Sequence, residues 1–257
     1  MTAIRSLLFN VVFFGWTAVA SFFAFLTFLL SRSSYLVHRV ARIWSGVGFV
    51  FLRGICGIEY RIRGLENLPD GPCILAAKHQ SAWDTMIFAH LVENPCFVLK
   101  RELLQVPLFG WALKQAGMVG VDRAGGASAL KRMVAEVRRR LAEGRPIVIF
   151  PEGTRVAPGV QRPYLPGVAA LYTSLGVPVV PVGLNSGLFW RRRSFMKTPG
   201  CILLELLPPI EPGLRRREFM KRLEEQVEGT SNRLIAEAGV EPPAAAEPRE
   251  LKTNQER

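Results

Sequence analysis

The sequence predicts an α/β fold with a mixed, largely parallel sheet flanked by helices and an N-terminal hydrophobic helical membrane anchor. Residues 6–31 contain no charged side chain and are dense in Leu, Phe and Val. From Glu59 onward, short apolar runs alternate with turns and amphipathic segments, as strands and helices alternate in α/β layers. Apolar residues make up 49% of the 257 residues, which excludes a disordered chain and allows one sizeable core.

The uncharged segment at residues 6–31 is long enough for a membrane helix, since a rise of about 1.5 Å per residue carries it across a hydrocarbon core of about 30 Å. A cleaved signal peptide is the alternative, because Ala18-Val19-Ala20 looks like a cleavage site. Hydrophobicity continues through residues 22–30, so we expect a retained anchor. Only Arg5 precedes the segment, whereas four arginines follow it, which places the C-terminal body in the cytoplasm beside the inner membrane. These four are Arg32, Arg39, Arg42 and Arg53.

A second apolar stretch, residues 43–58, is shorter and is interrupted by Arg53. It either pairs with the first as a helical hairpin that enters one leaflet or lies in the membrane interface. We therefore assign residues 1–57 to membrane-anchoring helices and residues 58–240 to one globular domain. Residues 241–257, rich in Pro, Ala and Glu, are expected to form a disordered tail.

One alternating segment and six short apolar runs predict the strands of the sheet, and unbroken apolar runs are typical of parallel strands covered on both faces. Apolar residues at helical spacing between 130 and 141 predict an amphipathic helix, with Ser128 as its N-cap and Gly144 as its stop. Residues 218–238 predict a final amphipathic helix. The predicted strands are residues 58–63, 73–77, 96–99, 117–121, 147–150, 179–182 and 201–204.

The net charge of +12 suggests an anionic partner, which is a nucleic acid, an anionic lipid surface, or an acidic substrate or carrier. The arginine runs at 191–193 and 215–217 are candidates for a lipid contact, with a solvated face as the alternative. Four cysteines without C-x-x-C spacing indicate buried free thiols in a reducing compartment and no structural zinc site. Neither G-x-S-x-G nor G-x-x-x-x-G-K-[ST] occurs, so a hydrolase nucleophile elbow and a nucleotide-binding loop are unsupported.

The strongest chemical signal is His79 followed by Asp84 directly beyond the predicted strand at 73–77. Reactive residues gather beyond the carboxyl ends of strands in open α/β sheets. A carboxylate that holds one imidazole nitrogen leaves the other free to accept a proton, so the pair fits a general base. The alternative is that Asp84 caps the next helix and His79 only packs at the strand end. Without a covalent nucleophile, such a base points to direct transfer to a substrate hydroxyl.

Two further segments follow predicted strands. Phe150-Pro151-Glu152-Gly153-Thr154-Arg155 offers backbone N–H groups at a glycine turn, a hydroxyl and a guanidinium suited to phosphate. Val121-Asp122-Arg123 places another arginine at another strand end. The alternative for each is an ordinary surface ion pair, Glu152 with Arg155 and Asp122 with Arg123.

Together these segments resemble the glycerolipid acyltransferase family, specifically the bacterial 1-acylglycerol-3-phosphate acyltransferases. The H-x-x-x-x-D motif is His79 to Asp84, the second block is similar to residues 117–123, and the third is FPEGTR at 150–155. Residues 177–182 resemble the fourth block, and residues 107–111 a segment before the second. The likeness covers residues 78–182 in the expected order. Many members have Asn before the motif histidine, where this chain has Lys78.

The resemblance implies that His79 accepts the proton of the sn-2 hydroxyl of lysophosphatidic acid while Asp84 orients the ring, giving phosphatidic acid. The acyl donor would be acyl-CoA or acyl-carrier protein, membrane lipid would be a further partner, and neither a cofactor nor a nucleic acid is implied. The domain at 58–240 would be the acyltransferase domain. By the same resemblance the substrate-binding residues would be Arg123 and Arg155, which hold the acceptor phosphate, and Glu152, Gly153 and Thr154, which shape that site.

Two alternatives stay open. The first keeps the chemistry and changes the acceptor to another lysophospholipid or a lyso-aminolipid. The second is a basic, membrane-anchored binding protein without activity.

Overall fold

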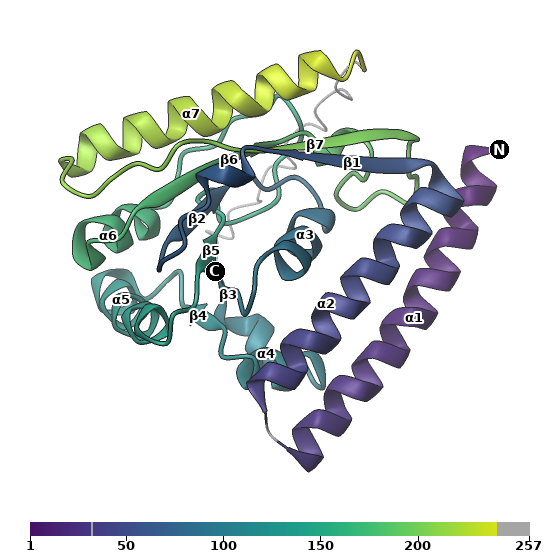
Figure 1. Cartoon of the computed structure of the whole chain (residues 1–257), viewed down its shortest axis with the longest axis horizontal. Helices are drawn as coiled ribbons and strands as arrows, with labels where there is room; N and C mark the ends of the chain where they lie inside the picture. The colour runs from purple at the N-terminus through teal and green to yellow at the C-terminus, as the bar shows by residue number, and fades with distance from the viewer. Residues whose placement is uncertain (32, 241–257) are drawn as a thin grey trace, which may run out of the picture.

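A computed structural model describes residues 1–31 and 33–240, so Arg32 and the predicted tail at 241–257 lie outside the described residues. The predicted α/β fold is confirmed, because seven strands form one sheet that helices cover on both faces (Figure 1). In chain order the helices and strands are α1 (Thr2–Leu30), α2 (Ser34–Phe51), β1 (Ile58–Arg63), β2 (Ile74–Ala77), α3 (Trp83–Leu91), β3 (Cys96–Lys100), α4 (Phe109–Gln115), β4 (Val119–Val121), α5 (Gly126–Ala142), β5 (Ile147–Ile149), α6 (Pro166–Leu175), β6 (Val179–Leu184), β7 (Gly200–Leu206) and α7 (Arg216–Glu237).

The strand order is β1-β7-β6-β2-β5-β3-β4. The last five strands in this order run parallel, whereas β7 pairs antiparallel with β6 and β1 pairs parallel with β7. Every residue of β2, β5 and β6 is buried, as expected for central strands covered on both faces. The carboxyl ends of the five parallel strands therefore open on one edge of the sheet, where the predicted site residues follow them.

Alternation along β2 sends neighbouring side chains into different layers. Leu75 and Ala77 join the core formed with α1, α2 and α3. Ile74 and Ala76 join the core formed with α5, α6 and α7. The Lys78 amide still donates to the Val182 carbonyl (3.0 Å), so the strand geometry extends one residue beyond β2. The alternation thus directs Lys78 toward the α6 and α7 layer and His79 toward the α3 layer.

The predicted helix at 130–141 is confirmed as α5, and Gly144 follows its end with a left-handed φ of 75°. The predicted N-cap at Ser128 is wrong, because the N-cap of α5 is Gly125, three residues earlier. Asp122 accepts the Ala124 amide (3.0 Å), and this tight turn lets the helix begin at Gly126. Ser128 then lies in the first turn, where its hydroxyl donates back to the Gly125 carbonyl (3.0 Å), a bond typical of serine within a helix.

The second apolar stretch pairs with the first, since α1 and α2 lie antiparallel side by side (Figure 1). Near the start of α1, Phe9 and Phe13 are buried and meet the edge of Trp190 at centroid distances of 5.5 and 5.6 Å. Near its end, Phe28 stacks on Trp111 of α4 (5.8 Å). Both ends of α1 therefore contact the same globular body, and the helix lies along that body instead of projecting from it.

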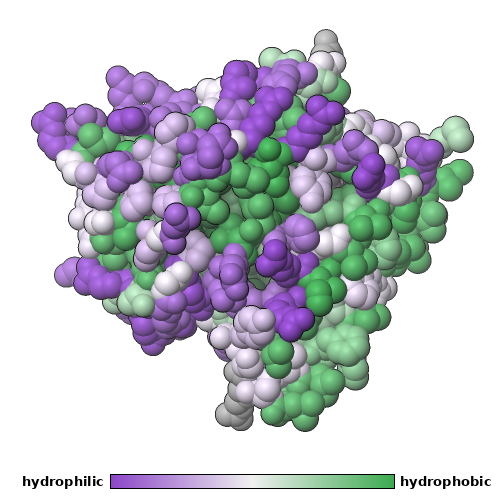
Figure 2. All heavy atoms as spheres, viewed as in Figure 1, coloured by the Kyte–Doolittle hydropathy of each residue, from purple (hydrophilic) through white to green (hydrophobic). Residues whose placement is uncertain are grey.

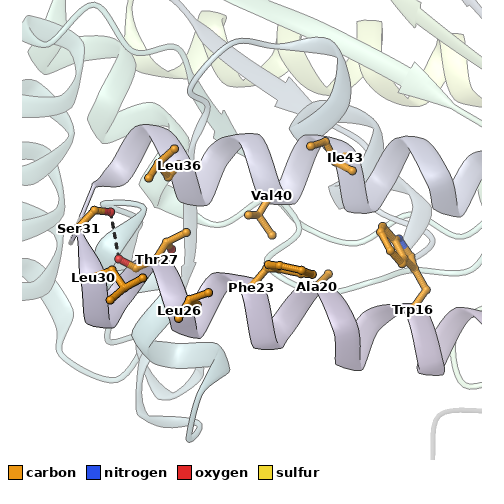
Figure 3. A pocket seen from close by; sticks show the side chains of 10 residues that line it. All are labelled: Trp16, Ala20, Phe23, Leu26, Thr27, Leu30, Ser31, Leu36, Val40 and Ile43. Carbon is orange, nitrogen blue, oxygen red and sulfur yellow. Dashed lines mark hydrogen bonds between the residues drawn. The ribbon is translucent and has the colours of Figure 1, made fainter.

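The hairpin presents an apolar surface. Among the described helices, α1 is the one long and apolar enough to cross a membrane, and many of its large apolar side chains are exposed. Figure 2 shows hydrophobic residues concentrated over α1 and α2, while hydrophilic residues dominate much of the remaining face. A cavity of about 430 Å³ between the two helices is lined almost entirely by apolar side chains, including Ala20, Phe23, Leu26, Val40 and Ile43 (Figure 3).

Candidate active site

The structure brings His79 and Asp84 together at the carboxyl end of β2. His79 Nδ1 lies 2.9 Å from Asp84 Oδ2, and the carboxylate is fully buried. The same oxygen accepts the backbone amides of Gln80 (2.6 Å) and Ser81 (2.8 Å). Asp84 lies in the first turn of α3, where a negative charge is favourable. It therefore accepts the amides of the turn before α3 and also holds the His79 ring. The N-cap of α3 is Ala82, so the alternative that Asp84 caps this helix is wrong.

Ser186 completes the surroundings of the Asp84 carboxylate, and the sequence reasoning missed it. Its hydroxyl donates to Asp84 Oδ1, so both carboxylate oxygens are engaged. The preceding residue, Asn185, is fully buried, donates to the Leu234 carbonyl (3.0 Å) and accepts the Leu203 amide (2.8 Å). Asn185 thereby fixes the chain that carries Ser186 against β7 and α7. Both oxygens of this buried carboxylate thus have hydrogen-bond partners.

Residues 150–156 contact the ring, the amide and the carbonyl of His79. The Phe150 ring stacks on the imidazole with centroids 4.0 Å apart. Glu152 Oε2 accepts the His79 amide (3.1 Å), and the Val156 amide donates to the His79 carbonyl (2.8 Å). The imidazole is 12% exposed, and within the described residues no hydrogen bond occupies Nε2. With Nδ1 facing a carboxylate, Nε2 is the free position for a proton.

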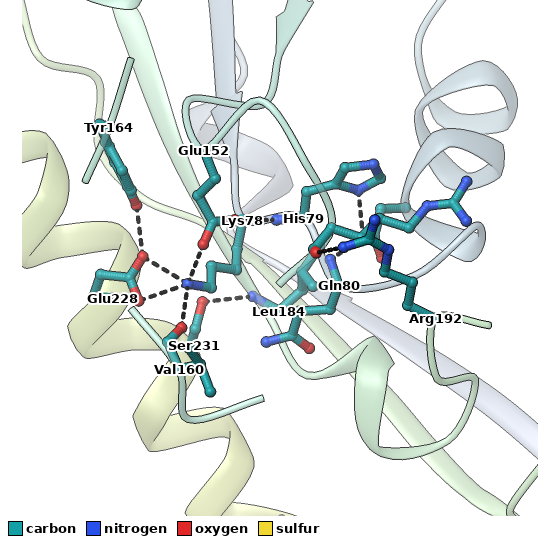
Figure 4. A network of polar contacts seen from close by, with 12 residues as sticks. Lys78, His79, Gln80, Glu152, Val160, Tyr164, Leu184, Arg192, Glu228 and Ser231 are labelled. Atoms are coloured by element: carbon teal, nitrogen blue, oxygen red, sulfur yellow. Dashed lines mark hydrogen bonds and ion pairs between the residues drawn. The ribbon is translucent and has the colours of Figure 1, made fainter. Parts of the chain in front are cut away.

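A buried charge network lies behind His79 (Figure 4). Lys78 Nζ contacts Glu152 Oε1 at 2.6 Å and both carboxylate oxygens of Glu228 at 2.8 Å. Burial raises the pKa of the Glu152 carboxyl to about 7, although the charge of Lys78 acts in the opposite direction. Because the Glu152 carboxylate faces Lys78 and not Arg155, the alternative of a solvent-exposed Glu152–Arg155 pair is wrong.

The arginines predicted to bind phosphate lie around the same segment. Arg123 follows β4 and is exposed, and its guanidinium carbon lies close to Gly153, 3.4 Å from where a Cβ on that glycine would stand. Gly153 has φ 66°, and Leu165 fills the space of a side chain there, so glycine is required. Thr154 and Arg155 follow and are partly exposed.

Further arginines gather beside Arg155. Arg192 donates to the Arg155 carbonyl (2.9 Å), and Figure 4 shows Arg192 on the His79 side of the network. Partial burial lowers the pKa of the Arg192 guanidinium, and the charges of Arg193, Arg155 and Arg162 lower it further. Several guanidinium groups close enough to repel one another form a site suited to a multiply charged anion.

Asp122 does not pair with Arg123. Its nearest cationic group is Arg101, at 3.8 Å, and its other oxygen accepts the Ala124 amide. The alternative of a surface pair between Asp122 and Arg123 is therefore wrong, and the Arg123 guanidinium has no carboxylate bonded to it among the described residues.

An apolar pocket of about 170 Å³ opens beside Phe150, Arg123 and Gly153. Its walls come from β3, β4, α5, β5 and α6, and include Leu99, Val121, Leu130, Met133 and Val168. A pocket with apolar walls and a cationic rim suits a ligand with an aliphatic part and an anionic group.

The cysteines offer no activated nucleophile. Cys56, Cys73 and Cys96 are buried free thiols, as predicted. Burial raises the pKa of Cys73 and of Cys96 to about 11, so both thiols stay protonated near neutral pH. Covalent catalysis by either thiol is therefore disfavoured.

Comparisons with known proteins identify the family. A family profile described as acyltransferase matches residues 59–185. The 1-acyl-sn-glycerol-3-phosphate acyltransferase of Pseudomonas aeruginosa is 33% identical over 239 residues, which cover 91% of this chain and 91% of the relative. The chain belongs to the acyltransferase family. It is therefore an enzyme, which excludes the alternative of a binding protein without activity.

Other acyltransferases support the same assignment. The 1-acyl-sn-glycerol-3-phosphate acyltransferase alpha of Mus musculus is 28% identical over 158 residues, covering 60% of this chain and 55% of that relative. The crystal structure of the 1-acyl-sn-glycerophosphate acyltransferase PlsC from Thermotoga maritima matches with a TM-score of 0.75 and 25% identity, over 92% of this chain and 98% of that one. The acyltransferase fold thus extends over the hairpin as well as the sheet.

We predict that Ser186→Ala lowers the turnover of the acyltransferase about tenfold or more, because a hydrogen bond to a charged carboxylate contributes about 1.5–3 kcal/mol. Steady-state acyl transfer at saturating substrates measures this. Ser174→Ala, which changes an exposed serine of α6, is the matched control. Equal turnover in the two variants would show that Ser186 does not support Asp84.

Proposed function

We propose that the enzyme transfers an acyl group from acyl-CoA or acyl-carrier protein to the sn-2 hydroxyl of 1-acylglycerol-3-phosphate and so forms phosphatidic acid. The observation that carries this proposal is His79, held at Nδ1 by a buried carboxylate and open at Nε2, beside arginines that pair with no carboxylate among the described residues. The names of the Pseudomonas and Thermotoga relatives support the choice of acceptor. Another lysophospholipid or a lyso-aminolipid stays the alternative acceptor.

The proposed reaction is a direct transfer with His79 as the base. His79 Nε2 accepts the proton of the acceptor hydroxyl while the hydroxyl oxygen attacks the thioester carbonyl carbon. Asp84 stabilises the resulting imidazolium through the Nδ1–H bond. When the tetrahedral intermediate collapses, the carbon–sulfur bond breaks, and His79 returns the proton to the departing thiolate sulfur. The new ester and a free thiol leave, and His79 is neutral again.

We propose that Arg123 and Arg155 bind the acceptor phosphate from opposite sides of Gly153 and Thr154, where a guanidinium can make two parallel hydrogen bonds to phosphate. Glu152 has a different role in this proposal. Its carboxylate is buried against Lys78, so it shapes the site by holding the His79 amide and not by contacting the phosphate. The apolar pocket beside Arg123 would accommodate an aliphatic chain.

We propose that the hairpin of residues 1–57 is retained and lies in one leaflet, with residues 58–240 on the cytoplasmic face of the inner membrane. Contact of both ends of α1 with the body supports an orientation along the membrane surface. The loop after Trp190 lies beside α1, since Asn10 and Lys197 both donate to the Phe195 carbonyl. Its arginines at 191–193 would meet anionic headgroups, whereas Figure 1 shows the start of α7, with residues 215–217, far from the hairpin.

We predict that the purified protein in detergent, supplied with labelled acyl-CoA or acyl-carrier protein and a panel of lyso-acceptors, forms phosphatidic acid from lysophosphatidic acid. His79→Ala removes the base and should lower turnover at least about a hundredfold, since general base catalysis contributes about 10²–10⁴-fold. Circular dichroism and vesicle binding of this variant should match the wild type. Absence of acyl transfer to every acceptor by the wild type would overturn the proposed function.

We predict that Arg123→Ala and Arg155→Ala each raise the KM for lysophosphatidic acid about tenfold or more, because a charge-assisted bond contributes about 1.5–3 kcal/mol. Acceptors without a terminal phosphomonoester should be affected much less. Arg132→Ala, on the exposed face of α5, is the control. Equal losses on all acceptors would remove these two arginines from the phosphate site.

We predict that Phe14, Phe22 and Phe23, which are all exposed on α1, together anchor the protein in lipid. Changing the three to Ser should weaken binding to neutral and anionic vesicles alike, by about tenfold or more, because each buried phenylalanine contributes about 1.5–3 kcal/mol. Changing Arg191 and Arg193 to Glu should remove only the preference for anionic vesicles, since each basic residue contributes about 1 kcal/mol there.

The same charge reversal at Arg215 and Arg217 is the control for vesicle binding, and we expect no effect. Wild-type binding by the triple Ser variant would contradict the orientation of the hairpin in one leaflet. Loss of the anionic preference at Arg215 and Arg217 instead would assign the lipid contact to α7.

A further inference from the structure

Lys78 stands where the alternation of β2 requires an apolar residue. It follows Ile74 and Ala76 on the side of the sheet that faces α5, α6 and α7, and it is 1% exposed. A lysine ammonium in such a place is unstable unless it has both countercharge and hydrogen bonds. The partners of Lys78 therefore decide whether this strand end can form.

The partners come from two segments far along the chain. Glu152 of the FPEGTR segment and Glu228 of α7 both contact Nζ, and the Val160 carbonyl accepts a further bond (3.1 Å). The Tyr164 hydroxyl donates to Glu228 Oε1 (2.9 Å). Side-chain exposure is 0% for Glu152 and 5% for Glu228. One ammonium thus serves two buried carboxylates, and each carboxylate keeps a second donor.

The second donor to Glu152 is the backbone amide of His79 (3.1 Å). Lys78 Nζ holds Oε1 of this carboxylate, and His79 is held by Oε2. Rotation of the Glu152 carboxylate would therefore break both contacts at once. Glu228 fixes Lys78 on its other side, so the chain of contacts runs from α7 through Lys78 and Glu152 to the peptide that carries the imidazole.

We propose that the buried pair of Lys78 and Glu228 makes α7 part of the catalytic apparatus, with both as positioning residues that fix His79 through the Glu152 carboxylate. This inference rests on the proposed role of His79 as the base. It also accounts for Lys78, which occupies the position where many family members have Asn. Neither residue touches substrate, and both act by holding His79 in the position from which Nε2 reaches the acceptor hydroxyl.

The network also predicts a signature in the pH dependence. The charged groups around Glu152 are Lys78 from the end of β2 and Glu228 from α7, with the Tyr164 hydroxyl from the loop before α6. Lys78 lowers the pKa of Glu152 and Glu228 raises it. Protonation of Glu152 would weaken its hold on Lys78 and on the His79 amide, so we expect it to contribute to the acid limb of the kcat profile. Removing Lys78 should therefore move this limb to higher pH. Removing the charge of Glu228 should move it to lower pH.

The test compares Lys78→Met and Glu228→Gln with Lys221→Met and Glu225→Gln. The control pair forms an exposed ion pair on the same helix, with side chains 77% and 65% exposed. We expect kcat to fall about tenfold to a hundredfold in each network variant, because a displaced catalytic group has an effect of this size. KM should stay within about twofold, and the acid limbs should move in opposite directions. The double variant should lose less than the product of the two single losses.

Selective ¹⁵N-histidine labelling gives a readout that does not depend on activity. The chain has three histidines, and His79→Ala identifies the amide signal of His79. We expect this signal to shift upfield in both network variants, because its bond to Glu152 weakens, and to stay in place in both controls. If Lys78→Met does not fold, Glu228→Gln decides alone, since it preserves the size of the side chain.

If Glu228→Gln has the same turnover and the same His79 amide signal as the controls, this inference is overturned. If turnover is lost in His79→Ala but kept in the variants of Lys78 and Glu228, the proposed function stands and only the positioning role is removed. A wild type without acyl transfer would instead overturn the proposed function.

Discussion

The site depends on one buried carboxylate. Asp84 has no exposed surface and accepts from the His79 ring, from two backbone amides before α3, and from Ser186. A buried carboxylate is costly unless hydrogen-bond donors face both of its oxygens. Those donors come from the turn between β2 and α3 and from the end of β6, so the approach of these two segments is a condition for the site. The direct pairing of β2 with β6 satisfies this condition.

The sheet order explains why three distant segments meet there. Because β2 lies between β6 and β5 and the three run parallel, the segments beginning at 78, 150 and 185 leave the sheet on one edge. The first supplies the imidazole, the second its stacking ring and backbone contacts, and the third Ser186 and Arg192. The hairpin packs beside the same elements, since Trp190 follows β6 and contacts α1. A substrate that stays in a leaflet would thus meet the base at the membrane surface.

The sequence predicted those parts that local patterns encode. All seven strands occur within a few residues of their predicted positions, because six are apolar runs bounded by turns and β1 alternates apolar and polar residues. The His79–Asp84 contact follows from the strand-to-helix turn. The partners of Lys78 and the donor from Ser186 were missed, because Lys78 and Glu228 lie 150 positions apart and no local pattern relates them.

One signal was available, since Glu228 lies among Leu223, Val227, Ser231 and Leu234 on the buried stripe of α7, where a charge requires a partner. The Ser128 cap failed because the Asp122 turn starts the helix earlier than apolar spacing suggests.

Carboxylates lie on both faces of the end of β2, and the proposed chemistry gives a reason for them. Arginines gathered for an anionic acceptor repel the positive charge that develops on His79 when it takes the proton. Asp84 on one side of the strand end and the excess carboxylate of the Lys78 network on the other oppose that repulsion. Binding of the acceptor phosphate would neutralise the arginines further, so the base meets its hydroxyl in a site whose positive charge is already compensated. In the proposed reaction, the phosphate that fixes the acceptor would therefore also favour the proton transfer that starts it.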